Sequence, residues 1–363
     1  MEFIDLKCQY KRYEKEIDTA IKEVLESGHY VMGSAITDLE KALAEYVQVK
    51  HCVATSSGTD SLLLALKALG IGPGDEVICV PFTWISPIEV VRRLQAVPVF
   101  VDIDPETCLM DTTQIEKAIS KKTKAIIPVS LYGQMPNFDE ILNISKKYNI
   151  AIIEDGAQSF GATQNGKYSC GVTTIGVTSF FPTKPLGCYG DGGALFTNRD
   201  DIAEKVKALR VHGAVERYNH QYIGMNGRMD TLQAAILLAK LPFFNEELVN
   251  RERIGKYYNE HLKNQFSIPK TNKGNRHVYA QYTLQSESRE TVLEGLKSEK
   301  IPHAIYYPIC IHEQPAYLDL GYQKGDFPCA EKVANSVFSL PMHPWISQEE
   351  QDKIINTLKT SIL

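Results

Sequence analysis

One lysine in this sequence stands in surroundings that are unusual for a surface lysine. In the stretch "SFFPTKPLGCYGDGGALF", residues 179–196, Lys184 lies between Pro182 and Pro185, after an aromatic pair and before a glycine-rich run. Prolines restrict the backbone at their own position and at the position before them. A lysine in a partly desolvated site has a lowered pKa and can form a Schiff base with an aldehyde. The stretch indicates a lysine positioned for chemistry, with an ordinary loop lysine as the alternative.

A second stretch carries acidic groups. "IIEDGAQSFGA", residues 152–162, has the pattern of a buried strand that ends in Glu154 and Asp155. A carboxylate just past a buried strand needs a cationic partner or hydrogen bonds. Taken alone, the pair is either part of a ligand site or a structural ion pair.

A third stretch could bind an anion. "TSSGTDSLLLAL", residues 55–66, opens a helix near Thr59, with the hydroxyl of Ser57 beside it. Backbone N–H groups at a helix start bind phosphate, although an ordinary N-cap has the same pattern. The three stretches together match pyridoxal phosphate, which needs a phosphate cradle, an aldehyde-binding lysine and an acid that keeps its ring nitrogen protonated. Lys184 follows Asp155 by 29 residues (184 − 155).

The elements that must position these side chains follow a regular order. From residue 52 onward, short apolar β-branched runs alternate with helical patterns. We predict strands at 76–81, 97–103, 124–130, 150–156, 174–181 and 193–198. We predict helices at 12–27, 36–47, 59–69, 84–94, 112–120, 137–148, 200–209 and 229–240. This alternation predicts a mostly parallel sheet covered on both sides, whose ligands bind at the carboxyl ends of its strands.

The pattern changes near residue 245. A long polar helix leads into "VYAQYTLQ", residues 278–285, which reads as a strand. A helix near 289–299 and a strand near 301–307 follow. This order predicts a smaller α+β domain packed on the first.

Composition narrows the classes of function. The 363 residues are 44% hydrophobic and carry a net charge of −5, so the chain can bury a sizeable core and has no basic footprint for nucleic acid. No run approaches the roughly 18 apolar residues of a membrane span, and the start lacks the apolar core of a signal peptide. The eight cysteines form no CxxC and the nine histidines have no paired-ligand spacing. We therefore expect reduced thiols in a cytoplasm, no membrane or nucleic-acid partner, and no metal site.

Seven motifs in a fixed order resemble one family: "SSGTDSL", "PGDEVI", "PFTW", "PVSLYGQ", "IIEDGAQSFGA", "SFFPTKPLGCYGDGGALFTN" and "GMNGRMDTLQAAIL". Over essentially its whole length the chain resembles the DegT/StrS family of pyridoxal-phosphate-dependent nucleotide-sugar aminotransferases, in its 3-aminotransferase branch. The resemblance implies the aspartate-aminotransferase, or type I, α/β fold. Residues 1–242 would form a large domain with a mostly parallel seven-stranded sheet, and residues 243–363 a smaller α+β domain.

The resemblance also implies roles for single residues. Lys184 would hold the cofactor's aldehyde as an imine and move a proton, and Asp155 would pair with the ring nitrogen. Gln158 would lie near the cofactor's 3-hydroxyl, and Trp84 would stack on the ring, with a core tryptophan as the alternative. The residues expected at the phosphate are Gly58, Thr59, Ser179 and, across a dimer interface, Asn226. The residues expected at the substrate are Tyr189, Arg228, Tyr306 and Tyr307.

The implied reaction transfers an amino group from L-glutamate to a nucleotide-linked keto sugar in a homodimer, as in deoxyamino-sugar and O-antigen synthesis. The cofactor would alternate between pyridoxal phosphate and pyridoxamine phosphate. A sugar dehydratase of the family has histidine in place of the lysine, so Lys184 favours transamination. A non-enzymatic regulator is disfavoured because the catalytic set is intact.

The identity of the sugar is left with alternatives. "NGRMDTLQAAIL" is similar to members that act on 3-keto sugars rather than 4-keto sugars. "AIYYPIC" places Tyr306 where uronate-acting relatives have a histidine, which predicts a neutral dTDP-linked 3-keto-6-deoxyhexose. The alternatives are a UDP-linked 2-acetamido-2-deoxy-3-keto-glucuronate, a 4-keto sugar, and Tyr307 in place of Tyr306 as the contacting residue.

Overall fold

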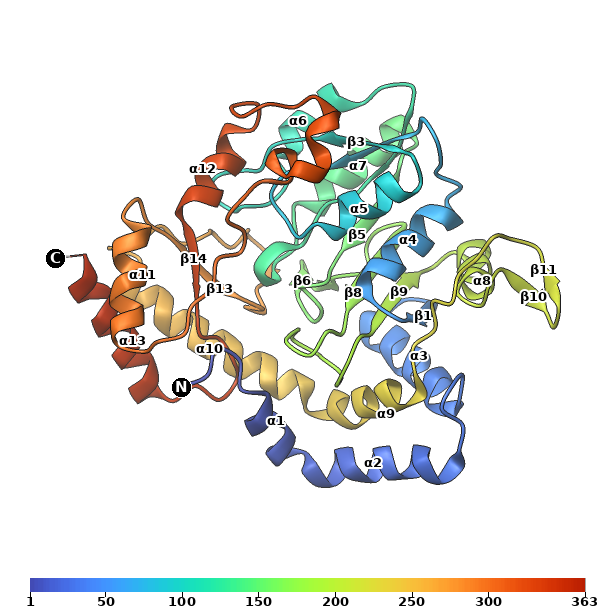
Figure 1. Cartoon of the computed structure of the whole chain (residues 1–363), viewed down its shortest axis with the longest axis horizontal. Coiled ribbons are helices and arrows are strands. Elements are labelled where there is room, and N and C mark those ends of the chain that lie inside the picture. The colour runs from blue at the N-terminus through green and yellow to red at the C-terminus, as the bar shows by residue number, and fades with distance from the viewer. Residues whose placement is uncertain (363) are drawn as a thin grey trace.

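A seven-stranded sheet forms the centre of the structure, a computed structural model that describes residues 1–362 (Figure 1). Its strand order is β1-β9-β8-β5-β4-β2-β3, and β9 pairs antiparallel with both β1 and β8, whereas the other neighbouring strands pair in parallel. The mostly parallel seven-stranded sheet is thereby confirmed. The strands are β1 (His51–Thr55), β2 (Glu76–Cys79), β3 (Val97–Phe100), β4 (Thr123–Ile126), β5 (Ala151–Asp155), β8 (Ile175–Ser179) and β9 (Gly193–Thr197).

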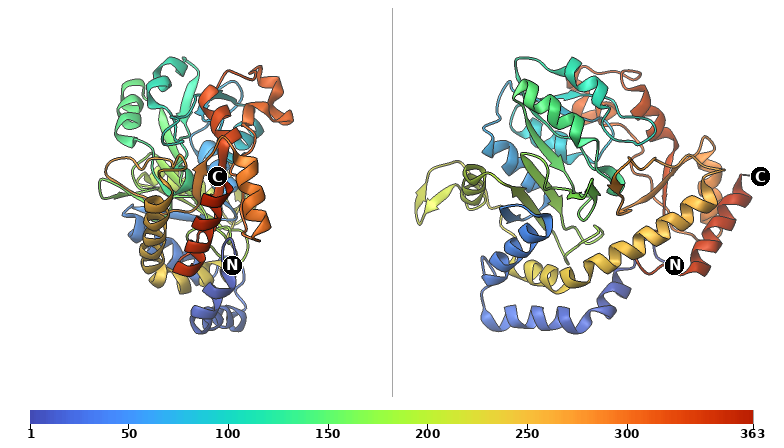
Figure 2. Two further views of the ribbon diagram at one scale, coloured as in Figure 1. Left: turned by 90° about the vertical axis from the view of Figure 1, so that its left-hand side faces the viewer. Right: turned by 180° about the vertical axis from the view of Figure 1, so that it is seen from behind.

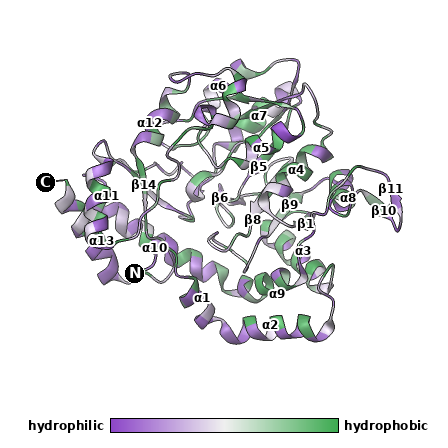
Figure 3. Ribbon diagram, in the orientation of Figure 1, coloured by the Kyte–Doolittle hydropathy of each residue, from purple (hydrophilic) through white to green (hydrophobic). Residues whose placement is uncertain are grey.

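Helices cover both faces of this sheet. Consecutive residues along β5, β8 and β9 are buried, which requires cover on both sides. Figure 3 shows hydrophobic residues gathered along the central strands, whereas α2 and α13 carry mixed faces. The helices of this part are α1 (Leu6–Arg12), α2 (Glu14–Ser27), α3 (Ser34–Val47), α4 (Gly58–Ala68), α5 (Ser86–Arg93), α6 (Thr112–Ala118), η1 (Leu131–Gly133), α7 (Phe138–Tyr148), α8 (Asp200–Leu209), α9 (Thr231–Lys240) and η2 (Leu241–Phe243).

A second core forms toward the C-terminus, around the long helix α10 (Figure 2, right). It joins α10, α11 and α13 to a two-stranded sheet of β13 and β14. These elements are α10 (Phe244–Leu262), β13 (Tyr282–Gln285), α11 (Arg289–Ser298), β14 (Val337–Leu340) and α13 (Gln348–Ser361). The segment between them, with η3 (Ile311–Glu313), η4 (Pro315–Leu320) and α12 (Pro328–Ser336), packs instead on the first core. A domain division between residues 242 and 243 stays our proposal.

Small strands complete the structure. β6 (Thr163–Gln164), β7 (Lys167–Tyr168) and β12 (Asn275–Arg276) form a three-stranded sheet. The hairpin of β10 (Ala214–Glu216) and β11 (Asn219–His220) extends away from the body, as both Figure 1 and the right panel of Figure 2 show. Its tip carries Tyr218, whose exposed fraction is 83%.

Three predictions about elements were wrong or incomplete. No strand forms at 301–307, where Ala304 makes only an isolated bridge to Ser339. The run 278–285 is a strand only from Tyr282, because its first residues turn toward α10 and η1 instead of pairing. The predicted helix 12–27 is α2, which begins at Glu14, and the short helix α1 before it was not predicted.

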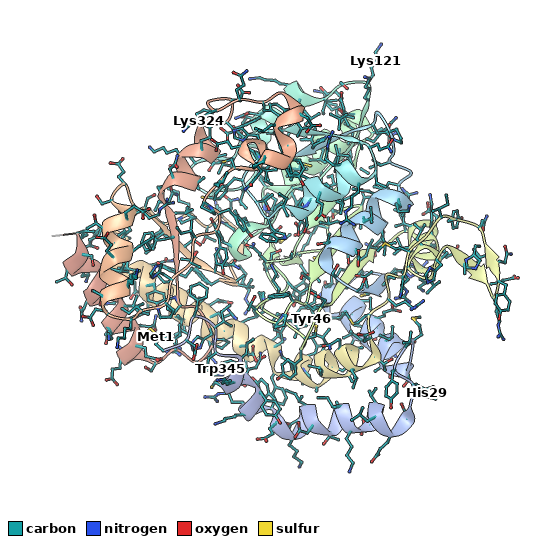
Figure 4. The ribbon with its side chains drawn as sticks, viewed as in Figure 1. Met1, His29, Tyr46, Lys121, Lys324 and Trp345 are labelled. Carbon is teal, nitrogen blue, oxygen red and sulfur yellow. The ribbon has the colours of Figure 1, made fainter. Side chains whose placement is uncertain are left out.

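The two ends of the chain lie on the same side of the structure. The amino group of Met1 lies 3.9 Å from the carboxylate of Glu350, and Arg12 lies over the ring of Trp345. Met1 and Trp345 are both labelled on this side of the structure in Figure 4. Within residues 1–362, no helix is both long enough and apolar enough to cross a membrane. No cluster of three potential metal-binding side chains occurs in that range either.

Candidate active site

Strand β5 ends in two adjacent carboxylates with different surroundings. Glu154 is fully buried and accepts hydrogen bonds from Ser130 Oγ at 2.7 Å, Ser169 Oγ at 2.6 Å and the Cys170 N–H at 2.7 Å. Burial raises the pKa of Glu154, and these hydrogen bonds act in the opposite direction. Glu154 therefore has its partners within the fold and is a structural residue.

Asp155 is also buried, but its carboxylate is only partly paired. One oxygen accepts a hydrogen bond from the Ala157 N–H at 3.0 Å, and the other has no donor in the described part of the chain. Burial raises the pKa of Asp155, whereas the Ala157 N–H and the charge of Lys184 lower it. A buried carboxylate with one free oxygen can pair with a cationic N–H group of a ligand.

The amine of Lys184 lies within electrostatic reach of Asp155. Burial lowers the pKa of Lys184, and the charge of Asp155 raises it. Because burial is the larger effect, it favours the uncharged amine, which is the nucleophilic form. The loop backbone is held by hydrogen bonds from the Lys184 N–H to the Phe181 carbonyl and from the Cys188 N–H to the Phe180 carbonyl, both at 2.8 Å.

The start of α4 offers free backbone donors. Ser57 caps the helix by accepting a hydrogen bond from the Asp60 N–H at 3.0 Å. The N–H groups of Gly58 and Thr59 donate to no protein acceptor within residues 1–362. A Cβ on Gly58 would lie 2.9 Å from the Cβ of Ser179, so only glycine lets the helix start approach β8 this closely. These donors and the Ser179 hydroxyl form a site suited to a phosphate.

Gln158 is held from two sides. Its Oε1 accepts a hydrogen bond from the Tyr132 N–H at 2.7 Å, and its Nε2 donates to the Tyr307 hydroxyl at 3.1 Å. The hydroxyl of Tyr132 in turn donates to the carbonyl of Tyr306. Residues from η1 and from the C-terminal region thus fix the side chain that follows Asp155.

An exposed indole ring borders this group. Trp84 has an exposed fraction of 58%, which rules out the core-tryptophan alternative. The centres of the Trp84 and Tyr307 rings lie 6.0 Å apart. Thr59, at the start of α4, shares a hydrogen bond of 2.8 Å with Ser86, which begins the helix after Trp84. A flat apolar surface therefore stands beside the phosphate site and can cover an aromatic ligand.

The predicted substrate tyrosines lie in three different environments. The Tyr307 hydroxyl lies beside Gln158, and burial and the charge of Asp155 raise its pKa, so it is neutral. The Tyr306 ring faces Phe3, with 6.3 Å between ring centres. The Tyr189 ring packs on Tyr10 and its hydroxyl is buried. Within residues 1–362, the Tyr307 hydroxyl is the one of the three that bonds to Gln158, and the Tyr306 ring lies next to it, with 5.8 Å between ring centres.

Asn226 and Arg228 lie in a loop beside the phosphate site, where the Ser56 N–H donates a hydrogen bond to the Gly227 carbonyl at 3.0 Å. They line a cleft of about 440 Å³ whose other lining residues include Ser56, Gly190 and the carboxylates of Asp191 and Asp230. Within residues 1–362, no hydrogen bond or ion pair joins either residue to Asp155 or Lys184. Arg228 is half-buried and has no carboxylate within ion-pair distance in that range. The cleft thus contains a guanidinium that is free to bind an anion.

The residues around Asp155, Lys184 and the start of α4 fit pyridoxal phosphate. The free N–H groups at the start of α4 suit its phosphate, the free oxygen of Asp155 suits a protonated ring nitrogen, and the desolvated amine of Lys184 suits its aldehyde. Tyr132 and Ser86 contribute to this arrangement but were not predicted. Tyr132 lies inside the motif "PVSLYGQ", which was the available signal, whereas nothing local distinguishes Ser86.

Known proteins are similar to this chain in sequence. The sequence model of the DegT/DnrJ/EryC1/StrS aminotransferase family matches residues 11–359. A UDP-2-acetamido-2-deoxy-3-oxo-D-glucuronate aminotransferase from Pseudomonas aeruginosa is 49% identical, over 95% of this chain and 96% of that protein. A UDP-N-acetyl-3-dehydro-alpha-D-glucosamine 3-aminotransferase from Acidithiobacillus ferrooxidans is 39% identical, over 99% and 97%. A dTDP-3-amino-3,6-dideoxy-alpha-D-galactopyranose transaminase from Aneurinibacillus thermoaerophilus is 39% identical, over 98% of each chain.

Solved structures of family members are similar to this chain in fold. A DegT DnrJ EryC1 StrS aminotransferase from Brucella abortus is 40% identical and superimposes with a TM-score of 0.96 over 99% of each chain. NtdA from Bacillus subtilis, solved with bound pyridoxamine phosphate, is 31% identical, with a TM-score of 0.89 over 97% of this chain and 82% of that one. These matches confirm the type I aminotransferase fold.

Proposed function

Because this chain belongs to the DegT/DnrJ/EryC1/StrS aminotransferase family, it is a pyridoxal-phosphate-dependent aminotransferase, and we propose that its amino acceptor is a UDP-linked 2-acetamido-2-deoxy-3-keto-glucuronate. L-Glutamate is the proposed donor, so the products are 2-oxoglutarate and the 3-amino uronate. The 49% identity to the Pseudomonas aeruginosa enzyme supports this substrate over the neutral dTDP-linked 3-keto-6-deoxyhexose that Tyr306 suggested. The dTDP-sugar relative is 39% identical.

The observation that carries the choice of a uronate is the free guanidinium of Arg228. It is half-buried and, among the described residues, has no carboxylate partner. A guanidinium binds a carboxylate with two parallel hydrogen bonds, which a neutral C6 methyl cannot replace. Tyr306, where uronate-acting relatives have a histidine, is the observation that favours the neutral sugar instead.

The chain's own residues divide the chemical work. Pyridoxal phosphate, when bound, supplies an electron-accepting ring that stabilises negative charge on the carbon that gains or loses a proton. Lys184 Nζ binds the cofactor's aldehyde and carries a proton between the reacting carbons. Asp155 keeps the ring nitrogen protonated. Gln158 orients the ring, Trp84 covers it, and the start of α4 with Ser179 holds the phosphate.

We also propose that the active unit is a homodimer in a cytoplasm. Asn226 is exposed, lies in the cleft with Arg228, and has no hydrogen bond to Lys184 within residues 1–362. A two-fold dimer brings such a loop to the other subunit's site twice, which gives two equivalent sites. The eight cysteines are all free, in agreement with a reducing compartment.

The substrate is tested in the reverse direction, from the stable amino sugars with 2-oxoglutarate. We expect kcat/KM to be higher for the UDP-linked 3-amino uronate than for the dTDP-linked 3-amino-3,6-dideoxyhexose. A preference for the dTDP sugar would contradict this proposal and favour the dTDP-linked 3-keto-6-deoxyhexose as the substrate. The same assay with other 2-oxo acids tests glutamate as donor.

A further inference from the structure

A second lysine lies behind the loop that carries Lys184. Lys240 is the last residue of α9, and only 2% of it is exposed. Its ammonium group donates a hydrogen bond to the carbonyl of Gly187, three residues after Lys184. Lysine is seldom buried to this extent without a charged partner, so the position calls for a physical reason.

The surroundings of Lys240 offer little compensation for burying a charge. Within residues 1–362, no carboxylate lies within ion-pair distance of its Nζ, and Gly187 is its only hydrogen-bond acceptor. The ring of Tyr189 lies 5.2 Å from the ammonium group. Burial lowers the pKa of Lys240 to about 8, and the charges of Glu247 and Cys188 act in the opposite direction. Glu247 itself is bound by the side-chain amide of Gln9.

The loop that Lys240 contacts is tightly folded. A Cβ on Gly187 would lie 2.5 Å from the carbonyl oxygen of Pro182, so the two ends of the Lys184 turn are in direct contact. A movement of the Gly187 backbone would therefore be passed on to the turn. Within residues 1–362, Lys240 is the only hydrogen-bond donor to the Gly187 carbonyl.

Helix α9 holds the same segment at a second point. The Tyr189 N–H donates to Gln233 Oε1 at 2.8 Å, and Gln233 Nε2 donates to the Tyr189 carbonyl at 3.4 Å. Gln233 and Lys240 thus attach residues 187–189 to α9 by side-chain contacts to the backbone.

We propose that Lys240 is a positioning residue for the reaction: its hydrogen bond to Gly187 fixes the loop of Lys184 against α9 and so places the Lys184 amine relative to Asp155. This inference rests on the role of Lys184 proposed above. The charge-assisted hydrogen bond is what a neutral side chain of the same length cannot supply.

The chain contains a matched control. Lys205, in α8, is half-buried, donates to a backbone carbonyl, that of Ala68 at 2.9 Å, and lies 5.8 Å from the ring of Tyr222. It therefore has the same kinds of contact as Lys240 but no contact with the Lys184 loop. Lys240→Met and Lys205→Met each remove the ammonium group and keep most of the side-chain volume.

The first measurement is hydrogen exchange of the backbone amides of residues 180–190 in the full-length protein, with and without cofactor. A charged hydrogen bond contributes roughly 1.5–3 kcal/mol, so exchange in this segment should rise about tenfold or more in Lys240→Met and stay unchanged in Lys205→Met. In the loaded enzyme, the pH midpoint of the cofactor's absorbance should move in Lys240→Met alone. We expect kcat to fall about tenfold with little change in KM, and Lys240→Arg to restore part of the loss.

Unchanged exchange of residues 180–190 in Lys240→Met would overturn the proposal, and so would equal effects of Lys240→Met and Lys205→Met. If Lys240→Met does not fold, Lys240→Gln replaces it, and the same comparisons decide. Turnover retained by a Lys184 variant would refute the proposed role of Lys184. The exchange data would still report whether Lys240 holds the loop, so the two failures can be told apart.

Discussion

Glu154 and Asp155 are chemically similar neighbours, yet the structure gives them different tasks. Glu154 has three donors within the fold, whereas one oxygen of Asp155 has none among the described residues. Side chains of consecutive strand residues point to opposite faces of the sheet. The Glu154 carboxylate therefore binds groups of neighbouring segments, whereas the Asp155 carboxylate keeps one oxygen that can bind a ligand. The same distinction separates Lys184, which lies near a free carboxylate, from Lys240, which holds a carbonyl.

Lys184→Ala should abolish turnover and covalent attachment of the cofactor. The substitution removes both the amine that binds the aldehyde and the group that carries the proton, and loss of such a group costs about 10²–10⁴-fold in rate. Borohydride reduction followed by mass spectrometry would measure attachment, with Lys205→Ala as the control. Turnover at a substantial fraction of wild type would refute the assignment.

Arg228→Gln should weaken catalysis on a uronate selectively. Loss of a charged hydrogen-bond partner costs roughly 1.5–3 kcal/mol, so kcat/KM for the UDP-linked 3-amino uronate should fall about 10–100-fold. The value for a neutral 3-amino-6-deoxyhexose should change little. Arg217→Gln, in the exposed hairpin, is the control. Equal losses on both sugars would mean that Arg228 does not read the carboxylate.

At the scale of elements, the site depends on how closely α4 approaches β8 and β9. Gly193 begins β9 and pairs with Thr55 at the end of β1 and with Ser179 at the end of β8. A Cβ on Gly193 would lie 2.4 Å from the carbonyl carbon of Ser57. The free N–H groups of the helix start can stand beside Ser179 only because two glycines, Gly58 and Gly193, leave room for the backbone.

Gly193→Ala should destabilise the protein and weaken cofactor binding. Overpacking of a filled site costs about 1–3 kcal/mol, and relief of the contact would displace the start of α4. Gly72→Ala is the matched control, since a Cβ there meets no atom within 4 Å. Thermal unfolding and cofactor titration would measure the two effects. A Gly193→Ala protein that binds cofactor as tightly as Gly72→Ala would contradict this account of the phosphate site.

At the scale of the whole molecule, the candidate functional residues fall into two groups that no hydrogen bond or ion pair joins within residues 1–362. Asp155, Lys184 and Gln158 lie at the carboxyl ends of the sheet strands, and Asn226 and Arg228 lie in the cleft beside α9. A second subunit is the simplest way to unite them. Stability is also a property of the whole fold, and two buried histidines contribute to its dependence on pH.

Mixed dimers should show whether the two groups act across subunits. A Lys184→Ala chain should be inactive on the uronate, and an Arg228→Gln chain should retain about 1–10% of the activity. After unfolding and refolding together, each mixed dimer would contain one intact site if the residues come from different subunits. Random pairing would then restore about a quarter of wild-type activity. No restoration, with mixed dimers present by mass spectrometry, would place both residues in the same subunit's site.

Acidification should destabilise the fold from about pH 6.5 downward. Burial lowers the pKa of His277 to about 3, and burial with the charge of Arg251 lowers that of His343 to about 4, from the ordinary 6.5. Between these values the unfolded chain binds protons that the folded chain excludes, so stability falls as pH falls. Each histidine should cost about 2 kcal/mol at pH 5.

The change in the free energy of unfolding between pH 7 and pH 5, measured with urea, tests this expectation. His277→Asn retains an acceptor for the Tyr279 N–H, which donates to His277 Nδ1 at 2.9 Å, and should reduce the change. His220→Asn, at an exposed position, should not. The same pH dependence in all three proteins would be the contrary result.

Local patterns in the sequence were enough to predict the alternating strands and helices of residues 76–240, the mostly parallel sheet and the Lys184–Asp155 pair. Periodicity, turn residues and the proline-bounded lysine are properties of neighbouring residues, so they can be read without a structure. The strand β1 and the absence of a strand at 301–307 depend on pairing with distant residues. The tertiary structure alone showed that Glu154 has its partners within the fold, that the Tyr307 hydroxyl meets Gln158, and that Lys240 lies behind the lysine loop. Each of these depends on which side chains meet across long separations in the chain, and a single sequence carries no local signal of such contacts.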